Sequence, residues 1–305
     1  LMIRRPPRST LDRSSAASDV YKRQIILISI WYFRDYPISK PDKKMFRSYK
    51  SYAFPVAAAS IFGIFKQHFD KIFIGIFFST YQVGLYFAVQ RIALFIGTFA
   101  LAIEEMLLPA VSKLHSIKKN KEVQSLVYDT EKYISMICIP VVVMTIIWSS
   151  EIIEVFISRE FLPASTILKL LALAALIRVV NRPWSIALRG SDRPDLTSIA
   201  NILAALLSII LMLILVPKQI PHLGLYDLPG LGGEGAAISV LVSEIFLGLS
   251  LRILCYLYLG MTPRFNFFLQ LFVAILVAAL MWQIQYNVIV DRWYELFLFL
   301  SLIHI

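Results

Sequence analysis

The stretch that decides the fold is Lys66-Gln67-His68-Phe69-Asp70-Lys71, which lies between the apolar runs Tyr52–Phe65 and Ile72–Phe78. Five of these six residues are polar. Consecutive residues of a helix are rotated by about 100°, so these side chains point in every direction around the axis. A charge at the centre of a bilayer costs about 2.5–3.5 kcal/mol on an insertion scale. We therefore expect the segment 66–71 to be surrounded by protein and water, or to lie at the membrane surface.

The composition of the whole chain is that of an integral membrane protein. Of its 305 residues, 58% are hydrophobic and 16% are charged, and the mean hydropathy is +0.70. Soluble proteins contain about 25% charged residues. The apolar runs approach or exceed the roughly 20 residues that a membrane-spanning helix needs, which favours helices over a barrel and predicts an all-α fold. Cys138 and Cys255 both lie in apolar runs and are interpreted as small core residues.

Two terminal segments are set aside from the fold. Residues 1–24 are basic and lack the apolar core of a signal peptide. They and residues 301–305 look like translated sequencing-adapter sequence, so we predict that both are artefacts and that the chain is a fragment open at each end. The rest divides into a truncated helix with a basic cytoplasmic linker at 25–50, a six-helix lobe at 51–258 and additional C-terminal helices at 259–300.

The apolar runs also predict where the chain crosses the membrane. After a short stump at Ile25–Phe33, the candidate helices are 51–79, 83–111, 133–149, 164–188, 196–216, 236–258, 266–285 and 294–305. Alternate loops carry most of the lysines and arginines, which places the following loops in the cytoplasm: 34–50, 112–132, 189–195 and 259–265. The loop 112–132 has an amphipathic pattern, which predicts a helix on the inner membrane surface.

Asp70 and Arg91 lie at similar depths in the predicted hairpin of helices 51–79 and 83–111. At about 1.5 Å per residue, each is roughly 12–15 Å from the outer turn. We expect them to pair, and two interpretations stay open: a bridge that locks the hairpin, or a substrate-facing role. Small or polar residues recur along one face of helix 83–111, which predicts that this face packs on a neighbour or lines a cavity. Glu104 is interpreted as interfacial.

Helix 164–188 contains Arg178 and Arg182, which are four residues apart and share a face. Two guanidinium groups on one face suit an anionic group such as a phosphate or pyrophosphate. Arg182 is near enough to the cytoplasmic end for its head group to reach the interface, so Arg178 is the stronger candidate. Pro183 is expected to kink the helix.

No pattern of catalytic residues appears in the chain. Its four histidines are scattered, and no pair of carboxylates is spaced for general acid–base work. The run Gly230–Gly233 follows no predicted strand, so it indicates a tight turn before a helix rather than a phosphate loop. We predict no enzymatic activity, no metal and no cofactor.

A series of short motifs runs in order along the chain. In sequence they are Tyr52-Ala53-Phe54-Pro55, Asp70-Lys71-Ile72-Phe73-Ile74-Gly75, Val83-Gly84-Leu85-Tyr86, Leu108-Pro109 with Ser112-Lys113-Leu114, Ile139-Pro140, Ala187-Leu188-Arg189-Gly190-Ser191-Asp192-Arg193-Pro194, and Leu215-Val216-Pro217 before Gly235-Ala236-Ala237-Ile238-Ser239. Over about residues 25–260 the series resembles the second half of a polysaccharide flippase of the multidrug, oligosaccharidyl-lipid and polysaccharide (MOP) exporter superfamily. It departs at Lys71, where arginine is common, and in a longer link at 218–234.

The resemblance implies a MATE/MOP-like helical bundle: the second lobe plus two extra helices, incomplete here because the first lobe is missing. It implies a flippase that carries a polyprenyl-pyrophosphate-linked oligosaccharide (an O-antigen, capsule or exopolysaccharide repeat unit) across a bacterial or archaeal plasma membrane by alternating access. The implied partners are this lipid-linked oligosaccharide, the phospholipid bilayer and glycan-assembly proteins, with no nucleic acid. The candidate cavity residues are Lys66, Lys71, Arg91, Arg178 and Arg182, with Asp70 as an ion-coupling residue or a structural pair.

Three alternatives stay open. A drug–cation antiporter of the same superfamily should line its cavity with carboxylates and aromatic rings. A membrane-embedded glycan polymerase or ligase would be an enzyme, and it usually needs a sizeable external loop with Arg or His. The longest external loop here, 217–235, has one Lys, one His and no Arg. The third alternative is a purely structural membrane subunit.

Overall fold

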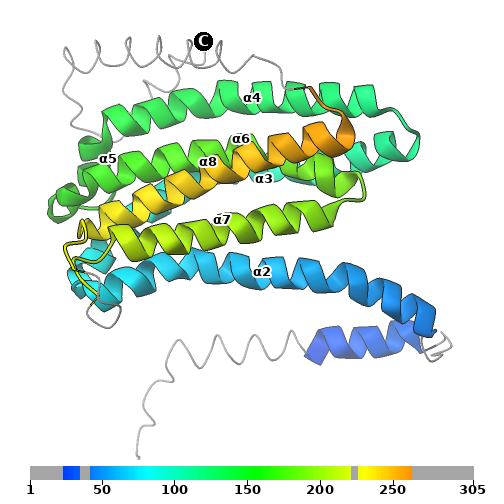
Figure 1. The fold of residues 1–305 in the computed structure, drawn as a ribbon, viewed down its shortest axis with the longest axis horizontal. Coiled ribbons are helices and arrows are strands. Elements are labelled where there is room, and N and C mark those ends of the chain that lie inside the picture. The colour runs from blue at the N-terminus through cyan, green and yellow to red at the C-terminus, as the bar shows by residue number, and fades with distance from the viewer. Residues whose placement is uncertain (1–22, 35–41, 221–225, 263–305) are drawn as a thin grey trace, which may run out of the picture. The chain divides into compact units, whose positions relative to one another are not determined.

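The computed structural model describes residues 23–34, 42–220 and 226–262, apart from some side chains of the two longest helices (Figure 1). The chain divides after Ser51 into two units, which are described separately. In the first unit, Arg23–Phe33 forms a short apolar helix, as the stump predicted. The predicted helices 266–285 and 294–305 lie outside the described residues.

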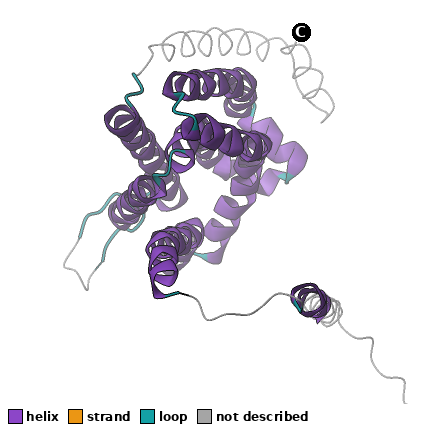
Figure 2. Cartoon of the chain, turned by 90° about the vertical axis from the view of Figure 1, so that its right-hand side faces the viewer, coloured by secondary structure: helices purple, strands orange, loops and turns teal. Residues whose placement is uncertain are grey.

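The second unit is a bundle of helices (Figure 1). Figure 2 shows helices and connecting loops, and no strand, in the described part of the chain, so the all-α prediction is confirmed. The elements in order are α2 (Lys43–Phe77, which begins in the first unit), α3 (Thr80–Ser116), α4 (Asn120–Ile147), α5 (Ser149–Phe156), the 3-10 helix η1 (Arg159–Ala164), α6 (Ser165–Gly190), α7 (Pro194–Leu215) and α8 (Gly232–Leu259).

The helices are long enough for a multi-pass membrane protein. Four stretches among the described residues are sufficiently long and apolar to cross a membrane: α4, η1 with α6, α7 and α8. Helices α2 and α3 have 35 and 37 residues. At about 1.5 Å per residue each exceeds the roughly 30 Å thickness of a hydrocarbon core, so part of each helix projects or tilts.

The prediction of a separate surface helix in the loop 112–132 was wrong. Helix α3 continues to Ser116 and α4 already begins at Asn120, so the connection is a short turn with Lys118 at a φ of 58°. The apolar side of the predicted surface helix packs inside the bundle instead, because Val123 and Val127 are buried in an apolar cluster. Residues 43–50 of the predicted linker are also helical, and the two short elements α5 and η1 were not predicted.

Helix α6 is the central element of the bundle because it packs against α3, α4, α7 and α8. Two apolar clusters lie toward opposite ends of these helices. One is built around Tyr86, Trp148 and Leu168, and the other around Val111, Trp184, Leu188 and Leu251. Apolar packing therefore holds both ends of α6, and the charged side chains lie between those ends.

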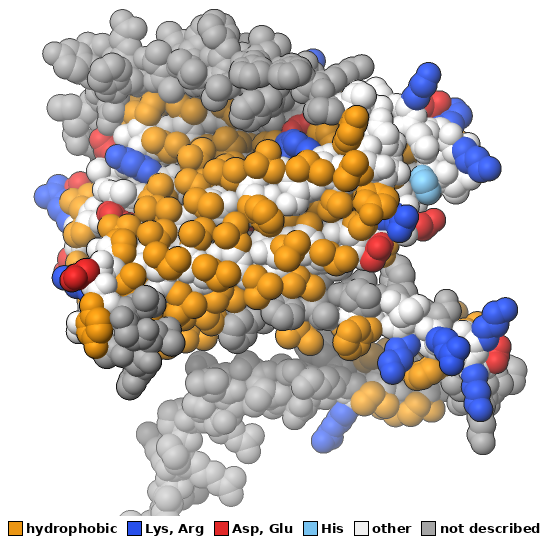
Figure 3. All heavy atoms as spheres, viewed as in Figure 1, with side chains coloured by type: hydrophobic (Ala, Val, Ile, Leu, Met, Phe, Trp, Pro, Cys, Tyr) orange, Lys and Arg blue, Asp and Glu red, His pale blue; other side chains and the backbone are white. Residues whose placement is uncertain are grey.

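The outer face of α7 and α8 is apolar. Figure 3 shows hydrophobic side chains covering this face almost continuously, with charged side chains at its two ends. On α7 the exposed residues are three or four positions apart, which makes one helical stripe: Ile199, Leu203, Leu206, Ile210 and Ile214. An exposed apolar surface of this extent is what a lipid-facing wall requires.

The turn before α8 follows the prediction from its glycines. Gly230 and Gly232 have φ values of 64° and 55°, a region that residues with a Cβ rarely adopt, and α8 begins at Gly232. Gly235 serves a different purpose. A Cβ at Gly235 would lie 2.7 Å from the backbone oxygen of Leu215, so its absence lets the start of α8 approach the end of α7.

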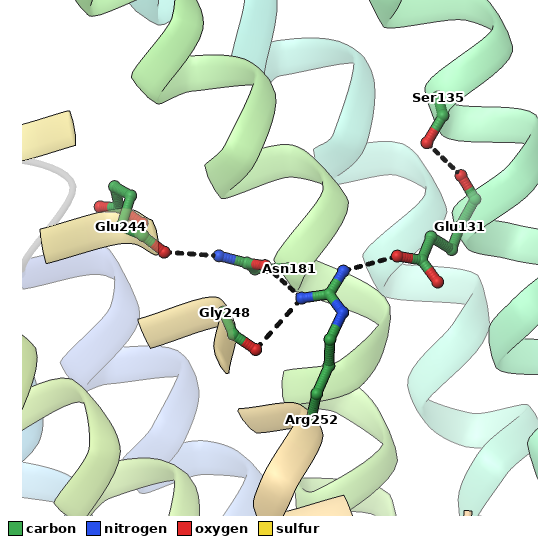
Figure 4. Close-up of polar contacts among 6 residues, drawn as sticks. All are labelled: Glu131, Ser135, Asn181, Glu244, Gly248 and Arg252. Carbon is green, nitrogen blue, oxygen red and sulfur yellow. Dashed lines mark hydrogen bonds and ion pairs between the residues drawn. The ribbon is translucent and has the colours of Figure 1, made fainter. Parts of the chain in front are cut away.

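A polar clamp made by Arg252, Asn181 and Glu131 joins α8, α6 and α4 (Figure 4). The Nη1 group of Arg252 donates to Asn181 Oδ1 at 2.9 Å and to the Gly248 carbonyl at 3.1 Å, and its Nη2 group donates to Glu131 Oε1 at 2.6 Å. Its guanidinium also lies 5.0 Å from the centroid of the Trp184 ring. One arginine thus fixes three helices in register, which positions α6 and α8 for the cavity described below.

Replacement of Gly235 by alanine tests the close approach of α7 and α8. We expect Gly235→Ala to destabilise the fold by about 1–3 kcal/mol, because the neighbouring atom is backbone and cannot rotate away. Gly84→Ala is the matched control: a Cβ there meets nothing within 4 Å, and alanine favours a helix by up to about 1 kcal/mol. Thermal melting in detergent measures both. Equal melting temperatures for the two variants would contradict the packing argument.

The clamp is also expected to contribute to the stability of the fold. Arg252→Met should lower stability by about 1–3 kcal/mol, because it leaves the Glu131 carboxylate without its cationic partner inside the bundle. Replacing both residues in Arg252→Met/Glu131→Met should recover part of the loss, since no unpaired charge remains. Thermal melting of the single and double variants provides the measurement. A double variant that loses more stability than the two single variants lose together would contradict a paired role.

Candidate functional site

A cavity of about 590 Å³ opens within the second unit between α2, α3, α6, α7 and α8. Six charged side chains line it: Asp70, Glu104, Arg178, Arg182, Arg189 and Glu244. Its other polar lining residues are Gln90, Asn181, Ser185, Thr197, Ser198 and Asn201, and the remainder are aliphatic or proline. Within the described part of the chain, no aromatic residue contributes to the lining.

The central pair of the cavity is Arg178 with Glu244. Arg178 Nη2 lies 3.2 Å from Glu244 Oε1, and Arg178 Nε donates to the same oxygen at 3.2 Å. The carboxylate is only 4% exposed, whereas the arginine side chain is 35% exposed. Glu244 is thus the buried anchor from α8, and Arg178 presents the accessible edge of the pair to the cavity.

Asn181 connects this pair to the clamp on the far side of α6. Its Nδ2 group donates to the backbone oxygen of Glu244 at 3.0 Å, while its Oδ1 atom accepts the bond from Arg252 (Figure 4). The contact is close, because a Cβ on Gly248 would lie 2.4 Å from Asn181 Oδ1. The backbone position of Glu244 is therefore set by a buried amide on α6.

A second charged group lies nearer the turn between α6 and α7. The Glu104 carboxylate of α3 accepts from two arginines of α6: Arg182 Nη1 bonds to Oε2, and Arg189 Nη2 bonds to Oε1. Arg182 and Arg189 are seven residues, or about two turns, apart and share a face. Glu104 is therefore part of the cavity wall, a place that was not predicted for it.

The predicted pair of Asp70 with Arg91 is replaced by a different contact. Gln90 Nε2 donates to Asp70 Oδ2 at 2.7 Å, and the backbone amide of Lys71 donates to Asp70 Oδ1 at 2.8 Å. Arg91 instead lies exposed over the Phe87 ring, 4.7 Å from its centroid. Asp70 therefore contacts the residue next to Arg91, because similar positions along two helices do not specify which face of α3 turns inward.

The structure thus brings only some of the predicted cavity residues together. Asp70, Arg178 and Arg182 line one cavity, whereas Lys71 and Arg91 lie over Phe87 outside its lining. Lys66 belongs to α2, but its side chain lies outside the described residues. The roles assigned to all six residues stay predictions.

The predicted small and polar face of α3 does not line this cavity. Gly84, Arg91, Thr98 and Glu105 are all exposed in the described bundle. The cavity side of α3 is formed by Gln90, Ala93, Leu94 and Glu104 instead. These four residues of the predicted face form an exposed stripe of the second unit instead.

Four residues of the site or its support were not predicted: Glu104, Arg189, Glu244 and Arg252. Two of them had a usable signal: Glu244 and Arg252 interrupt the apolar run 236–258, and an ionisable residue inside a span is a functional candidate by default. Arg189 was counted only as a loop charge. Its position two turns beyond Arg182 on the same helical face was the signal that could have found it.

The charges of the cavity balance but are unevenly placed. With all groups ionised, the Arg178–Glu244 pair is neutral, the group of Arg182, Arg189 and Glu104 has a formal charge of +1, and Asp70 stands apart with −1. Each guanidinium offers five N–H donors, and the bonds to Glu104 and Glu244 use only some of them. The arrangement suits an anion whose oxygens replace the carboxylate oxygens on the arginines.

Among the described residues, no cluster of His, Cys, Asp or Glu is arranged to hold a metal ion.

The chain is similar to known proteins in sequence and in fold. A family profile described as polysaccharide biosynthesis protein matches residues 15–166. This range begins inside the segment 1–24, so the prediction that this whole segment is an artefact stays a prediction. The chain is also 27% identical, over 179 residues, to the "Probable low-salt glycan biosynthesis flippase Agl15" of Haloferax volcanii.

Among solved structures, the fold is similar to "Lipid II flippase MurJ, inward closed conformation", with a TM-score of 0.57 and 19% sequence identity over 86% of this chain. The chain spans 59% of that structure, while its match to the Haloferax protein covers 59% of this chain and 38% of the relative. The family profile and the Haloferax relative support the resemblance seen in the motifs, to the polysaccharide flippases of the multidrug, oligosaccharidyl-lipid and polysaccharide exporter superfamily, and the solved structure shows that the fold is shared.

Proposed function

We propose that this chain forms part of a flippase that carries a polyprenyl-pyrophosphate-linked oligosaccharide across the plasma membrane of a bacterium or archaeon. The observation that carries the proposal is the set of three arginines on one helix, Arg178, Arg182 and Arg189, lining a cavity inside an apolar bundle. Guanidinium groups bind phosphate oxygens through paired N–H donors, so this wall is suited to a pyrophosphate.

The paired state of these arginines supports a carrier rather than a static scaffold. An isolated charge inside a membrane protein is costly, and pairing each arginine with Glu104 or Glu244 lets the cavity exist without a ligand. Because Arg178 and Arg182 are each 35% exposed, a phosphate reaches them without unfolding the wall. Binding then exchanges one anionic partner for another, which keeps the affinity moderate and permits release.

The surface of the bundle fits the other half of such a substrate. A polyprenyl tail is as apolar as the lipid around it, and the outer face of α7 and α8 is covered by aliphatic side chains (Figure 3). The tail therefore has no need of a cavity and remains in lipid while the charged head group crosses within the protein. Alternating access of the cavity to the two sides of the membrane then moves the head group and its glycan.

The lining of the cavity also favours this proposal over the drug–cation antiporter. A cation site should present carboxylates and aromatic rings to its ligand. Here the carboxylates of Glu104 and Glu244 are turned toward arginines, and the described lining contains no aromatic residue. We further propose that the role is transport rather than catalysis, since the three arginines of the cavity bond to Glu104 and Glu244 and not to a nucleophile.

Arg178→Ala in the complete protein tests the proposal. We expect export of the lipid-linked oligosaccharide to fall at least about tenfold, because a charge-assisted contact to phosphate is worth about 1.5–3 kcal/mol. Arg178→Lys should retain part of the activity, since it keeps the charge but loses the paired donors. Appearance of the glycan at the cell surface, normalised to protein in the membrane, provides the measurement.

Two matched variants separate a binding defect from a folding defect. Arg178→Ala/Glu244→Gln removes both charges of the central pair, so it should fold and still fail to export. Lys169→Ala removes an exposed cation of α6 that lies off the cavity, and it should export normally. Undiminished export by Arg178→Ala would exclude Arg178 from the site, and efflux of a cationic dye by the wild-type protein would favour the antiporter.

A further inference from the structure

The group of Arg182, Arg189 and Glu104 holds a carboxylate in the place where a phosphate would sit. The two arginines come from one face of α6, and each bonds to a different oxygen of the Glu104 carboxylate. A phosphate bound by both guanidinium groups would present its oxygens in the same way. Glu104 reaches this position from α3, so it is a side chain on one helix that satisfies two cations on another.

The two arginines are accessible from the cavity, and Glu104 neutralises only part of their charge and uses only some of their N–H donors. All three residues line the cavity, and the side chains are 35%, 34% and 19% exposed for Arg182, Arg189 and Glu104. One carboxylate faces two guanidinium groups, which leaves a formal charge of +1. Moreover, the Nε atom of Arg189 is buried and has no hydrogen-bond partner in the described part of the chain. Donor capacity is therefore left over after Glu104 has bonded.

We propose that Glu104 is an internal counter-ion that competes with the phosphate groups of the transported anion for Arg182 and Arg189. The inference rests on the proposed flippase function and adds to it a residue that opposes binding. In the empty cavity, Glu104 offsets the charge of the two arginines. When a diphosphate enters, its oxygens replace those of Glu104, and the return of Glu104 to the arginines drives release.

This role predicts that removal of the Glu104 charge tightens binding instead of weakening it. In the purified complete protein, Glu104→Gln should bind farnesyl diphosphate, a short prenyl diphosphate, on the order of fivefold more tightly than the wild type. Isothermal titration provides the dissociation constants. In a transport assay the same variant should reach half-saturation at a lower substrate concentration and show a lower maximal rate, because release is slowed. A merely structural role would not tighten binding.

Three further variants make the test specific. Glu105→Gln removes the neighbouring carboxylate, which is exposed and off the cavity, and it should leave the affinity unchanged. Glu104→Gln/Arg189→Ala should lose the gain, since one of the two released cations is gone. If Glu104→Gln does not fold, Glu104→Asp keeps the charge but is one methylene too short to reach both arginines, and it should show a smaller gain.

The outcomes separate this inference from the function on which it rests. If Arg178→Ala and Arg182→Ala bind farnesyl diphosphate as well as the wild type does, the proposed function fails and the inference fails with it. If those two variants lose affinity but Glu104→Gln binds no more tightly than the wild type, with an unchanged melting temperature, only the inference is overturned. Tighter binding by Glu104→Gln that depends on Arg189 supports it.

Discussion

The constraint on which the rest of the structure depends is that charges inside an apolar bundle must be paired. Helix α6 contributes three arginines to one cavity, and α3 and α8 each supply a carboxylate that meets them. Without those partners each arginine would have to leave the bundle or bind an ion, at a cost of several kcal/mol. The pairing explains why α6 lies at the centre, since it is the helix whose charges need neighbours on both sides.

The same constraint links stability to transport. The contact of Arg178 with Glu244 is rigid on its buried side, because Asn181 bonds to the backbone of Glu244 and to Arg252, which in turn reaches Glu131 on α4. On the cavity side, Arg178 and Arg182 remain open to a ligand. A fixed outer network with an exchangeable inner face lets a carrier bind an anion without losing its fold.

The architecture was largely predictable from the sequence, whereas the partners of the charges were not. Apolar runs located α4, α6, α7 and α8 to within several residues at most ends, apart from the start of α4, because hydropathy over about 20 residues depends little on tertiary contacts. Arg178 and Arg182 were recognised because they share a helical face. Spacing along one helix does not determine rotation relative to its neighbours, so Gln90 and not Arg91 meets Asp70, and Glu104 faces inward from a position that seemed interfacial.

The central claim is that this cavity receives an anionic lipid head group, and protection of a cavity position from chemical labelling tests it most directly. Ser185 lines the cavity, and the native Cys138 and Cys255 are buried, so Ser185→Cys in the complete protein introduces one accessible thiol in the described region. Farnesyl diphosphate should slow the reaction of this thiol with a water-soluble reagent, and it should leave labelling of the exposed control Lys113→Cys unchanged. Labelling of Ser185→Cys at the same rate with and without the diphosphate would contradict the account.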